Sequence, residues 1–377
     1  MVSSSNAPPS PGVALHGAVY GQNFGDVLIQ ALFYCCLAKA SPLRVSLPFA
    51  STGFLRDFNE TVMHIHGQAP VECKDLAFAC WGPGGYFGER PFRKAEWHQR
   101  LRDFHGQFLA YLRRHALPSV VYGVGVGPLT DEKSRNFVRQ CLDAASHVFV
   151  RDAQSHREAA SLGVDAGKIS ITPDAIFLLR PEDIPAGVYE KYARMLAIGD
   201  GRKKIGLHLP DIAGESGSDM KAVVDCVETI GANYDATDFY LIADSPHQEN
   251  KLAALRTRLG RMSNVSAVEY CGVIDLVGAI SCLDTVVTTK LHVGLCSFAL
   301  GHLPVSIYQH PKVLDQYQEA GIPEQCCPAS EMNTEWFHTA FARAVNFRQG
   351  SLAAEMAARR DAAVRDAREI ACMMSRP

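Results

Sequence analysis

The sequence Asp284–Lys312, DTVVTTKLHVGLCSFALGHLPVSIYQHPK, decides the fold because it contains a complete strand, helix and strand unit. Asp284–Thr289 is a β-branched run of strand length, and Leu291–Leu300 carries apolar residues at helical spacing. Pro304–Tyr308 is a second short apolar run, which predicts another strand. Units of this kind join strands of an α/β sheet.

Three basic or titratable side chains follow the strands of this unit. Lys290 and His292 come directly after the first strand, and Lys312 lies a few residues past the second. Ligands of such units bind beyond the carboxyl ends of the strands, so we expect these side chains to converge there. Two cations and an imidazole at one sheet edge predict an anionic ligand and a proton transfer.

Residues 203–330 alternate strands with helices and include this unit, which predicts a parallel, doubly wound sheet. The other expected strands are Lys204–Leu209, Phe239–Ala243 and Ser266–Tyr270, and the other expected helices are Asp219–Gly231, Gln248–Leu259, Ile274–Leu283 and Val313–Ala320. Gly321–Pro328 is expected to be a turn region. The remaining stretch, 331–377, is expected to be helical over Thr334–Phe347 and Leu352–Met373.

A similar alternation fills residues 13–180. The expected strands are Val13–Tyr20, Leu76–Trp81, Ser119–Val126, His147–Val150 and Ile169–Ile171, and the expected helices are Val27–Lys39, Phe92–His115, Asp131–Ala145 and Ser155–Leu162. Residues 181–202 lose strand periodicity and gather proline and glycine, so we expect a linker there. A chain of 377 residues also exceeds what one core usually supports. The sequence thus predicts two Rossmann-like domains, preceded by a disordered tail over residues 1–12.

Composition restricts the possible ligands. With 47% hydrophobic and 20% charged residues and a net charge of -3, the chain gives no electrostatic case for binding nucleic acid or a bare membrane surface. The twelve cysteines include no C-x-x-C pair and lie mostly in apolar runs, which indicates a reducing, cytoplasmic compartment. No segment approaches the roughly 18 apolar residues of a membrane span, and no ligand spacing suggests a metal.

The stretch Gly21–Asp26, GQNFGD, links the first strand to the first helix. Asp26 is expected to cap that helix, while Gly21 and Gly25 would let the backbone approach a ligand. Amides at a helix N-terminus attract anions or sugar hydroxyls. The alternative is an ordinary strand-to-helix turn without a ligand.

Arg151 is expected at the carboxyl end of the strand His147–Val150. A guanidinium at this edge can hold a carboxylate or a phosphate through paired hydrogen bonds. The alternative is a structural salt bridge between Arg151 and Asp152 or Asp174. The sequence leaves both interpretations open.

Several short motifs together resemble the polysaccharide pyruvyl transferase family, whose enzymes move pyruvate from phosphoenolpyruvate onto a sugar as a ketal. The resemblance runs from about Gly17 to Lys312. The motifs are G-Q-N-F-G-D at 21–26, W-G-P-G-G at 81–85, G-V-G-P-L at 125–129, V-R-D-A-Q-S at 150–155, Pro173-Asp174, T-T-K-L-H at 288–292, and Lys312 after a G-x-x-P strand. Each motif is short, but their order and spacing are specific.

The resemblance implies two facing Rossmann-like domains of the glycosyltransferase-B type with the active site in the cleft between them. It carries the donor-site arginine of the family onto Arg151, its histidine onto His292 and its downstream lysine onto Lys312. The residue before Leu-His is commonly arginine in the family and is Lys290 here, which keeps the charge but loses the planar fork. Phosphoenolpyruvate would be a co-substrate, and no other cofactor is implied.

A ketal forms from phosphoenolpyruvate when the methylene carbon is protonated, two hydroxyls of a sugar add and phosphate leaves. Arg151, Lys290 and Lys312 would neutralise the donor, and His292 is the candidate for proton transfer. The acceptor saccharide, free or lipid-linked, would lie against Asn23, Gly25, Asp26, Gly84 and Gly85, with Asp26 or Asp174 as the base for its hydroxyls. A lipid-linked acceptor would bring the protein to a membrane surface.

Two other functions are compatible with the sequence. A glycosyltransferase of the same architecture would use a nucleotide sugar and would need an acidic residue for the ribose, for which Asp244 to Glu249, DSPHQE, is the available stretch. That stretch also fits a loop and helix cap. A sugar- or phosphate-binding module without catalytic activity is the third interpretation.

Overall fold

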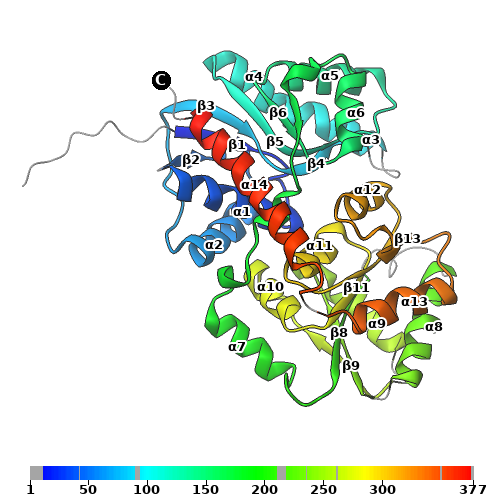
Figure 1. Ribbon diagram of the computed structural model, residues 1–377. Coiled ribbons are helices and arrows are strands. Elements are labelled where there is room, and N and C mark those ends of the chain that lie inside the picture. The colour runs from blue at the N-terminus through cyan, green and yellow to red at the C-terminus, as the bar shows by residue number, and fades with distance from the viewer. Residues whose placement is uncertain are drawn as a thin grey trace, which may run out of the picture.

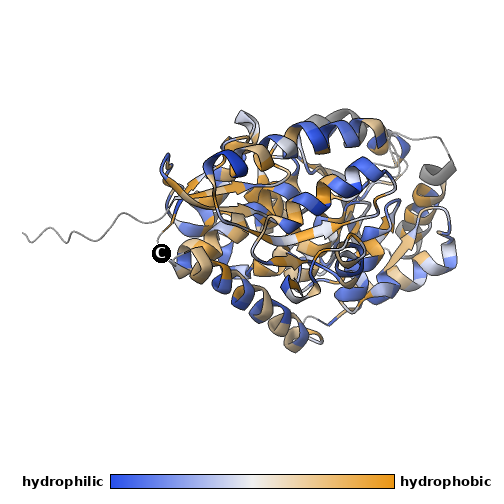
Figure 2. Cartoon of the chain, turned by 90° about the horizontal axis from the view of Figure 1, so that it is seen from above, coloured by the Kyte–Doolittle hydropathy of each residue, from blue (hydrophilic) through white to orange (hydrophobic). Residues whose placement is uncertain are grey.

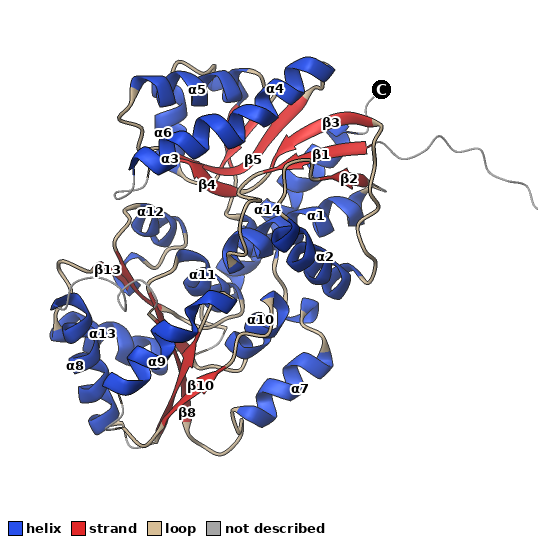
Figure 3. Ribbon diagram, turned by 180° about the vertical axis from the view of Figure 1, so that it is seen from behind, coloured by secondary structure: helices blue, strands red, loops and turns tan. Residues whose placement is uncertain are grey.

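The structure is a computed structural model that describes residues 12–41, 43–89, 94–209, 218–234, 236–259, 262–348 and 350–374. The described chain forms two parallel β-sheets, each with helices on both faces (Figures 1 and 3). This arrangement confirms the predicted fold class. The disordered tail that we expected over residues 1–12 lies outside the described residues, except for Gly12, which begins the first strand.

The first sheet belongs to the N-terminal half. Its strand order is β2-β1-β3-β5-β6-β7, with β4 also paired with β5, and all of its pairings are parallel. The strands are β1 (Gly12–His16), β2 (Arg44–Ser46), β3 (Leu76–Trp81), β4 (Gly84–Phe87), β5 (Ser119–Val126), β6 (Val148–Val150) and β7 (Ile169–Ile171). β5 is buried along its whole length, as its apolar sequence predicts for a strand covered on both faces.

The helices of this half surround the first sheet. They are α1 (Phe24–Ala40), α2 (Thr52–His66), α3 (Lys94–Arg100), one π-helical turn (Leu101–His105), α4 (Gly106–His115), α5 (Glu132–Asp143) and α6 (Ala153–Ser161). The single helix that we expected over Phe92–His115 is therefore interrupted by the π turn, and its first two residues lie outside the described residues. α1 is apolar all round and is buried along most of its length.

The second sheet has the strand order β10-β9-β8-β11-β12-β13. The strands are β8 (Lys203–His208), β9 (Thr237–Ile242), β10 (Val265–Val268), β11 (Thr285–Thr288), β12 (Val305–Tyr308) and β13 (Cys326–Pro328). The helices are α8 (Ser218–Asn233), α9 (Glu249–Arg258), α10 (Val273–Ser281), α11 (Leu291–Ala299), α12 (Lys312–Glu319) and α13 (Thr334–Val345). β13 lies inside Gly321–Pro328, where we expected only a turn region; its backbone extends the sheet by pairing with β12.

Two helices connect the halves. α7 (Ala186–Met195) lies within residues 181–202, where we expected a linker, and Val188 fills the space above Gly278 of α10. α14 (Ala353–Met374), red in Figure 1, returns to the first sheet, where the Tyr122 hydroxyl donates to the Ala363 carbonyl at 3.2 Å. We propose residues 13–180 and 203–330 as the two domains, because each range contains the strands of one sheet.

The larger of two apolar cores in the described chain links the two sheets. It includes Phe24 and Ile29 of α1 together with Leu291 and Leu295 of α11, and these two helices pack against each other. Hydrophobic residues follow the strands in the interior, while the outer helices present hydrophilic residues (Figure 2). The apolar contact between α1 and α11 therefore holds the two sheets together where these helices meet.

Candidate functional site

A cavity of about 300 Å³ lies between the carboxyl ends of the two sheets. We call it the central cavity. Its lining residues are Ala18, Tyr20, Asn23, Phe24, Gly25, Asp26, Gly85, Tyr86, Gly88, Arg151, Asp244, Thr289, Lys290, Leu291, His292, Val293, Gln309, His310, Lys312 and Val313. The strand order reverses between β1 and β3 in one sheet and between β8 and β11 in the other. Open α/β sheets bind ligands at such positions.

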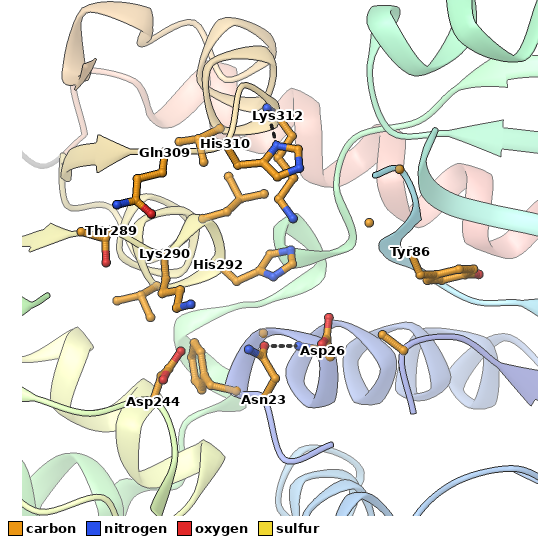
Figure 4. Close-up of a pocket in the computed structure, with 18 of the residues that line it drawn as sticks. Asn23, Asp26, Tyr86, Asp244, Thr289, Lys290, His292, Gln309, His310 and Lys312 are labelled. Atoms are coloured by element: carbon orange, nitrogen blue, oxygen red, sulfur yellow. Dashed lines mark hydrogen bonds between the residues drawn. The ribbon is translucent and has the colours of Figure 1, made fainter. Parts of the chain in front are cut away.

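The turn from β11 into α11 projects two side chains into the central cavity. Lys290 is the extended residue before α11, and its backbone N–H donates to the Thr288 hydroxyl at 3.0 Å. The Thr288 hydroxyl also lies 3.0 Å from Nδ1 of His208 on the neighbouring strand β8, and this contact helps to fix the turn. His292 follows in the first turn of α11, and both side chains point into the cavity in Figure 4.

His292 is held between the two halves of the molecule. Its ring lies directly against the backbone of Gly25, where a Cβ atom would overlap the ring. Its Nε2 lies 3.6 Å from Oδ2 of Asp174. Burial opposes ionisation of Asp174, but His292 and Arg151 outweigh burial and hold the pKa of this carboxyl below its ordinary value. An ionised carboxylate therefore stands behind the imidazole and can stabilise its protonated form.

Arg151 forms the salt bridges of one interpretation that the sequence left open, while its binding of an anionic ligand stays a prediction. Its side chain is 2% exposed, and its guanidinium lies 3.5 Å from carboxylate oxygens of both Asp152 and Asp174. The same guanidinium lines the central cavity. It rests on Gly125 of β5, where a Cβ would come within 2.8–2.9 Å of three of its atoms. The glycine in this strand therefore leaves room for the arginine.

Lys312 and Arg151 meet above Gly85. Nη2 of Arg151 and Nζ of Lys312 lie 3.3 and 3.5 Å from the point that a Cβ on Gly85 would occupy. Lys312 is the first residue of α12, and its backbone N–H donates to Nδ1 of His310 at 3.2 Å. Two cations from opposite halves thus lie close enough to contact one small anion.

The N-terminus of α1 provides the opposite wall of the cavity. Our expectation that Asp26 caps this helix is wrong: the cap is Asn23, whose Oδ1 accepts from the backbone N–H of Asp26 at 3.2 Å (Figure 4). The helix begins three residues earlier than the apolar periodicity indicated, which leaves Asp26 in its first turn. Asn23, Gly25 and Asp26 all line the central cavity.

Two of the predicted site residues lie outside the cavity lining. Gly84 belongs to β4, beside the lining residue Gly85. Asp174 is 2% exposed and faces Arg151 and His292 from behind. Its position fits a residue that orients these two side chains and does not fit a base that contacts an acceptor.

Sequence reasoning missed several lining residues, and it named Asp244 only as part of the stretch for a ribose contact in the alternative function. Asp244 follows β9, is 3% exposed, and lies 3.6 Å from Nε2 of His208. Burial opposes its ionisation, but His208 and Lys290 hold the pKa of Asp244 below its ordinary value. Gln248 forms hydrogen bonds with Asp244 in the loop before α9, but its side chain, at the N-cap position, does not cap that helix. The position of Asp244 directly after a strand could have identified it as a site residue, because Lys290 was identified from the same position.

The central cavity continues into a smaller one of about 260 Å³. Arg151, Lys312 and Gly85 line both, and the smaller cavity extends to Gly127 and Ser155. The cationic end of the site thus has room for a ligand larger than one anionic group. The described residues contain no cluster of three or more His, Cys, Asp or Glu that could hold a metal. Among the described helices, none has the length and apolar character needed to cross a bilayer.

Solved structures with the same fold are known. UDP-GlcNAc 2-epimerase from Neisseria meningitidis is 12% identical, with a TM-score of 0.60 and coverage of 96% of this chain and 98% of that chain. The α,α-trehalose 6-phosphate synthase from Burkholderia multivorans is 11% identical, with a TM-score of 0.54 and coverage of 97% and 98%. At these identities the likeness shows the glycosyltransferase-B-like fold alone.

Family membership comes from the sequence itself. No curated protein matches the chain. The pattern of the polysaccharide pyruvyl transferase family matches residues 23–311, which include α1 and the strands β2 to β12. The chain belongs to the polysaccharide pyruvyl transferase family.

Proposed function

We propose that the protein transfers pyruvate from phosphoenolpyruvate to a saccharide as a ketal, at a cytoplasmic stage of polysaccharide or glycoconjugate biosynthesis. One observation carries the proposal: Arg151 from the first half and His292 and Lys312 from the second line one cavity. This set matches the charge and the proton demand of phosphoenolpyruvate, which has a carboxylate, a phosphate and a methylene carbon that must be protonated.

In this proposal the donor lies at the end of the cavity where Arg151 and Lys312 meet. The guanidinium binds one anionic group through its planar fork, while the ammonium groups of Lys312 and Lys290 neutralise the rest. Asp152 and Asp174 hold the guanidinium in place, since each lies 3.5 Å from it. A buried arginine with two fixed partners loses little side-chain entropy when the donor binds.

His292 is the proposed proton donor to the methylene carbon. Protonation makes the adjacent carbon electrophilic, one acceptor hydroxyl adds to it, phosphate leaves, and the second hydroxyl closes the ketal. Of the two hydroxyl protons, one replaces the proton given to the methyl group and the other leaves with phosphate. Asp174 is the proposed positioning residue, because its carboxylate lies 3.6 Å from Nε2 of His292.

The acceptor is proposed to lie against the wall formed by Asn23, Gly25 and Asp26, opposite the cations. Asp244 adds a second carboxylate on this side of the cavity. Asp26 and Asp244 are therefore the candidates for hydrogen bonds to acceptor hydroxyls. Asp174, which we had considered for the same role from sequence, lies outside the cavity lining.

The test is an assay of phosphate release from phosphoenolpyruvate with a panel of glycosides, together with mass spectrometry for the added pyruvate. We expect release that depends on the acceptor, and a loss of about 100-fold or more in kcat for His292→Ala. If no glycoside consumes the donor and calorimetry detects no binding of phosphoenolpyruvate, the proposal is wrong.

A nucleotide-sugar transferase remains the second candidate because Asp244, in the stretch we had named for a ribose contact, lines the cavity. Thermal unfolding separates the two functions. Phosphoenolpyruvate should raise the Tm if the first proposal holds, whereas a nucleoside diphosphate should do so if the second holds. A binding module without catalysis would keep its ligand affinity in His292→Ala and show no turnover in either form.

A further inference from the structure

Tyr20 lies at the junction of three cavities. It lines the central cavity and two further cavities that are distinct from the one of about 260 Å³ described above. We call them the second cavity, of about 450 Å³, and the third cavity, of about 400 Å³. Asn23, Asp244 and Lys290 are shared between the central and the second cavity, so these two are continuous. The second and third cavities meet at Tyr20, and neither contains Arg151 or Lys312 of the cationic end. We call the second and third cavities together the Tyr20 groove.

The second cavity is suited to hydroxyl groups. Its lining includes Gln22, Gln248, Ser51 and Ser245, whose side chains carry amide and hydroxyl groups. Amides and hydroxyls both donate and accept, as sugar hydroxyls do. Gln22 is also held in place, since its Nε2 donates to Asp57 at 3.0 Å.

Tyr20 itself presents an aromatic surface fixed by its neighbours. The guanidinium carbon of Arg100 lies 4.6 Å from the centre of the Tyr20 ring, and the Phe104 ring packs against it edge-on at 5.1 Å. Tyrosine combines a rigid apolar face with a polar tip, which suits the C–H face and the hydroxyl rim of a sugar ring. Phe104 belongs to the π-helical turn, a feature often found at functional sites.

The charges of the described lining residues argue against a diphosphate in the groove. Asp244 accompanies Lys290 in the second cavity, while Glu96 and Asp103 accompany Arg100 in the third. Cations do not outnumber carboxylates in either cavity, whereas phosphate sites need a surplus of cations or converging amides. A neutral chain of sugars meets no such requirement.

We propose that the acceptor is an oligosaccharide, whose sugar units beyond the pyruvylated one lie along the Tyr20 groove. The inference rests on the proposed function and narrows its substrate class to neutral saccharide chains. The central cavity holds the donor and the reacting sugar, and the chain leaves it past Tyr20. A carrier diphosphate attached directly to the reacting sugar does not fit this path.

The experiment varies the length of the acceptor. p-Nitrophenyl glycosides with one, two or three hexose units of gluco, galacto or manno configuration are assayed for phosphate release, and their binding without donor is measured by saturation-transfer NMR. We expect kcat/KM for the best trisaccharide to exceed that of its monosaccharide by about tenfold, the scale of one aromatic contact. Tyr20→Ala and the exposed Arg100→Ala should each reduce this ratio to below about threefold.

A matched control is Tyr189→Ala on α7, since Tyr189 is 45% exposed and remote from the groove, and this variant should keep the ratio. Equal kcat/KM for one and three units, an unchanged ratio in both groove variants, or a preference for a polyprenyl-diphosphate-linked monosaccharide over the trisaccharide overturns the inference. If no glycoside consumes the donor, the proposed function fails, and the NMR binding measurement alone tests whether saccharides bind in the Tyr20 groove. Trisaccharide binding that weakens in Tyr20→Ala then supports the groove, and equal binding of all lengths refutes it.

Discussion

The contact between Gly25 and His292 gives a sharp prediction for the substitution Gly25→Ala. An added Cβ would lie 2.6 Å from Cβ and 2.7 Å from Cγ of His292, whereas ordinary contacts begin at 3.4 Å. His292, together with its backbone in α11, must therefore retreat by about 0.8 Å or more. A displacement of about 1 Å at a catalytic group costs roughly 100-fold in rate. We expect kcat to fall by about that factor.

The same substitution should lower the free energy of unfolding without abolishing the fold, because Cβ of His292 is fixed to the backbone and α1 and α11 must shift apart slightly. Gly25 is the second residue of α1, and alanine favours a helix over glycine by about 1 kcal/mol or less at such a position. Gly187, the second residue of α7, has no atom within 4 Å of an added Cβ, so Gly187→Ala is the matched control and should keep full activity. Single-turnover phosphate release and thermal unfolding are measured for both variants. A kcat within threefold of wild type for Gly25→Ala would refute the reasoning.

Three further predictions concern the charged groups behind the cavity. Because the folded-state pKa of Asp174 lies below its ordinary value of 3.8, its ionisation stabilises the fold above that pH, and the stabilisation is lost as the pH falls through the lowered value. In urea unfolding, Asp174→Asn should therefore have a much lower free energy of unfolding than the wild type at pH 6, and this difference should shrink towards pH 3. A difference that does not depend on pH would contradict this. Arg151→Lys loses the planar fork and should raise the KM for phosphoenolpyruvate about tenfold or more, with a smaller effect on acceptor KM. Gly125→Ala, whose Cβ would come within 2.9 Å of the Arg151 guanidinium, should weaken donor binding in calorimetry while leaving the position of His292 unchanged. An unchanged affinity would show that the guanidinium can move freely.

The elements that the sequence predicted correctly are those with an unambiguous pattern. β11 and α11 come from a β-branched run followed by apolar residues at helical spacing, and both appear within one residue of the expected ends. We had no expectation for α2, whose buried side is limited to Phe54, Phe58 and a few other residues among exposed polar ones. α7 was hidden by the prolines and glycines around it. Its Pro185 precedes the helix and does not interrupt it.

The site could be predicted as a set of residues but not as a geometry. Lys290, Arg151 and Lys312 were identified because each follows a strand, and the strand ends of a parallel sheet share one edge. His292 and Gly25 lie on helices of different halves of the molecule, so no local sequence pattern predicts their contact. The role of Gly125 was also invisible, since only the position of the Arg151 guanidinium explains a glycine in the middle of a buried strand.

The two sides of the cavity are held by different kinds of contact, and this difference bears on catalysis. His292 and Gly25 lie on α11 and α1, which pack in the shared apolar core, so the position of the imidazole is set by an apolar contact between the halves. The cationic side is joined by polar contacts instead, such as the 2.7 Å hydrogen bond from Gln316 of α12 to Asp152. Water competes for polar contacts more readily than for apolar ones. Under the proposed function, the proton donor is thus preorganised, and we expect any parting of the halves that admits phosphoenolpyruvate to occur on the side of Arg151 and Lys312.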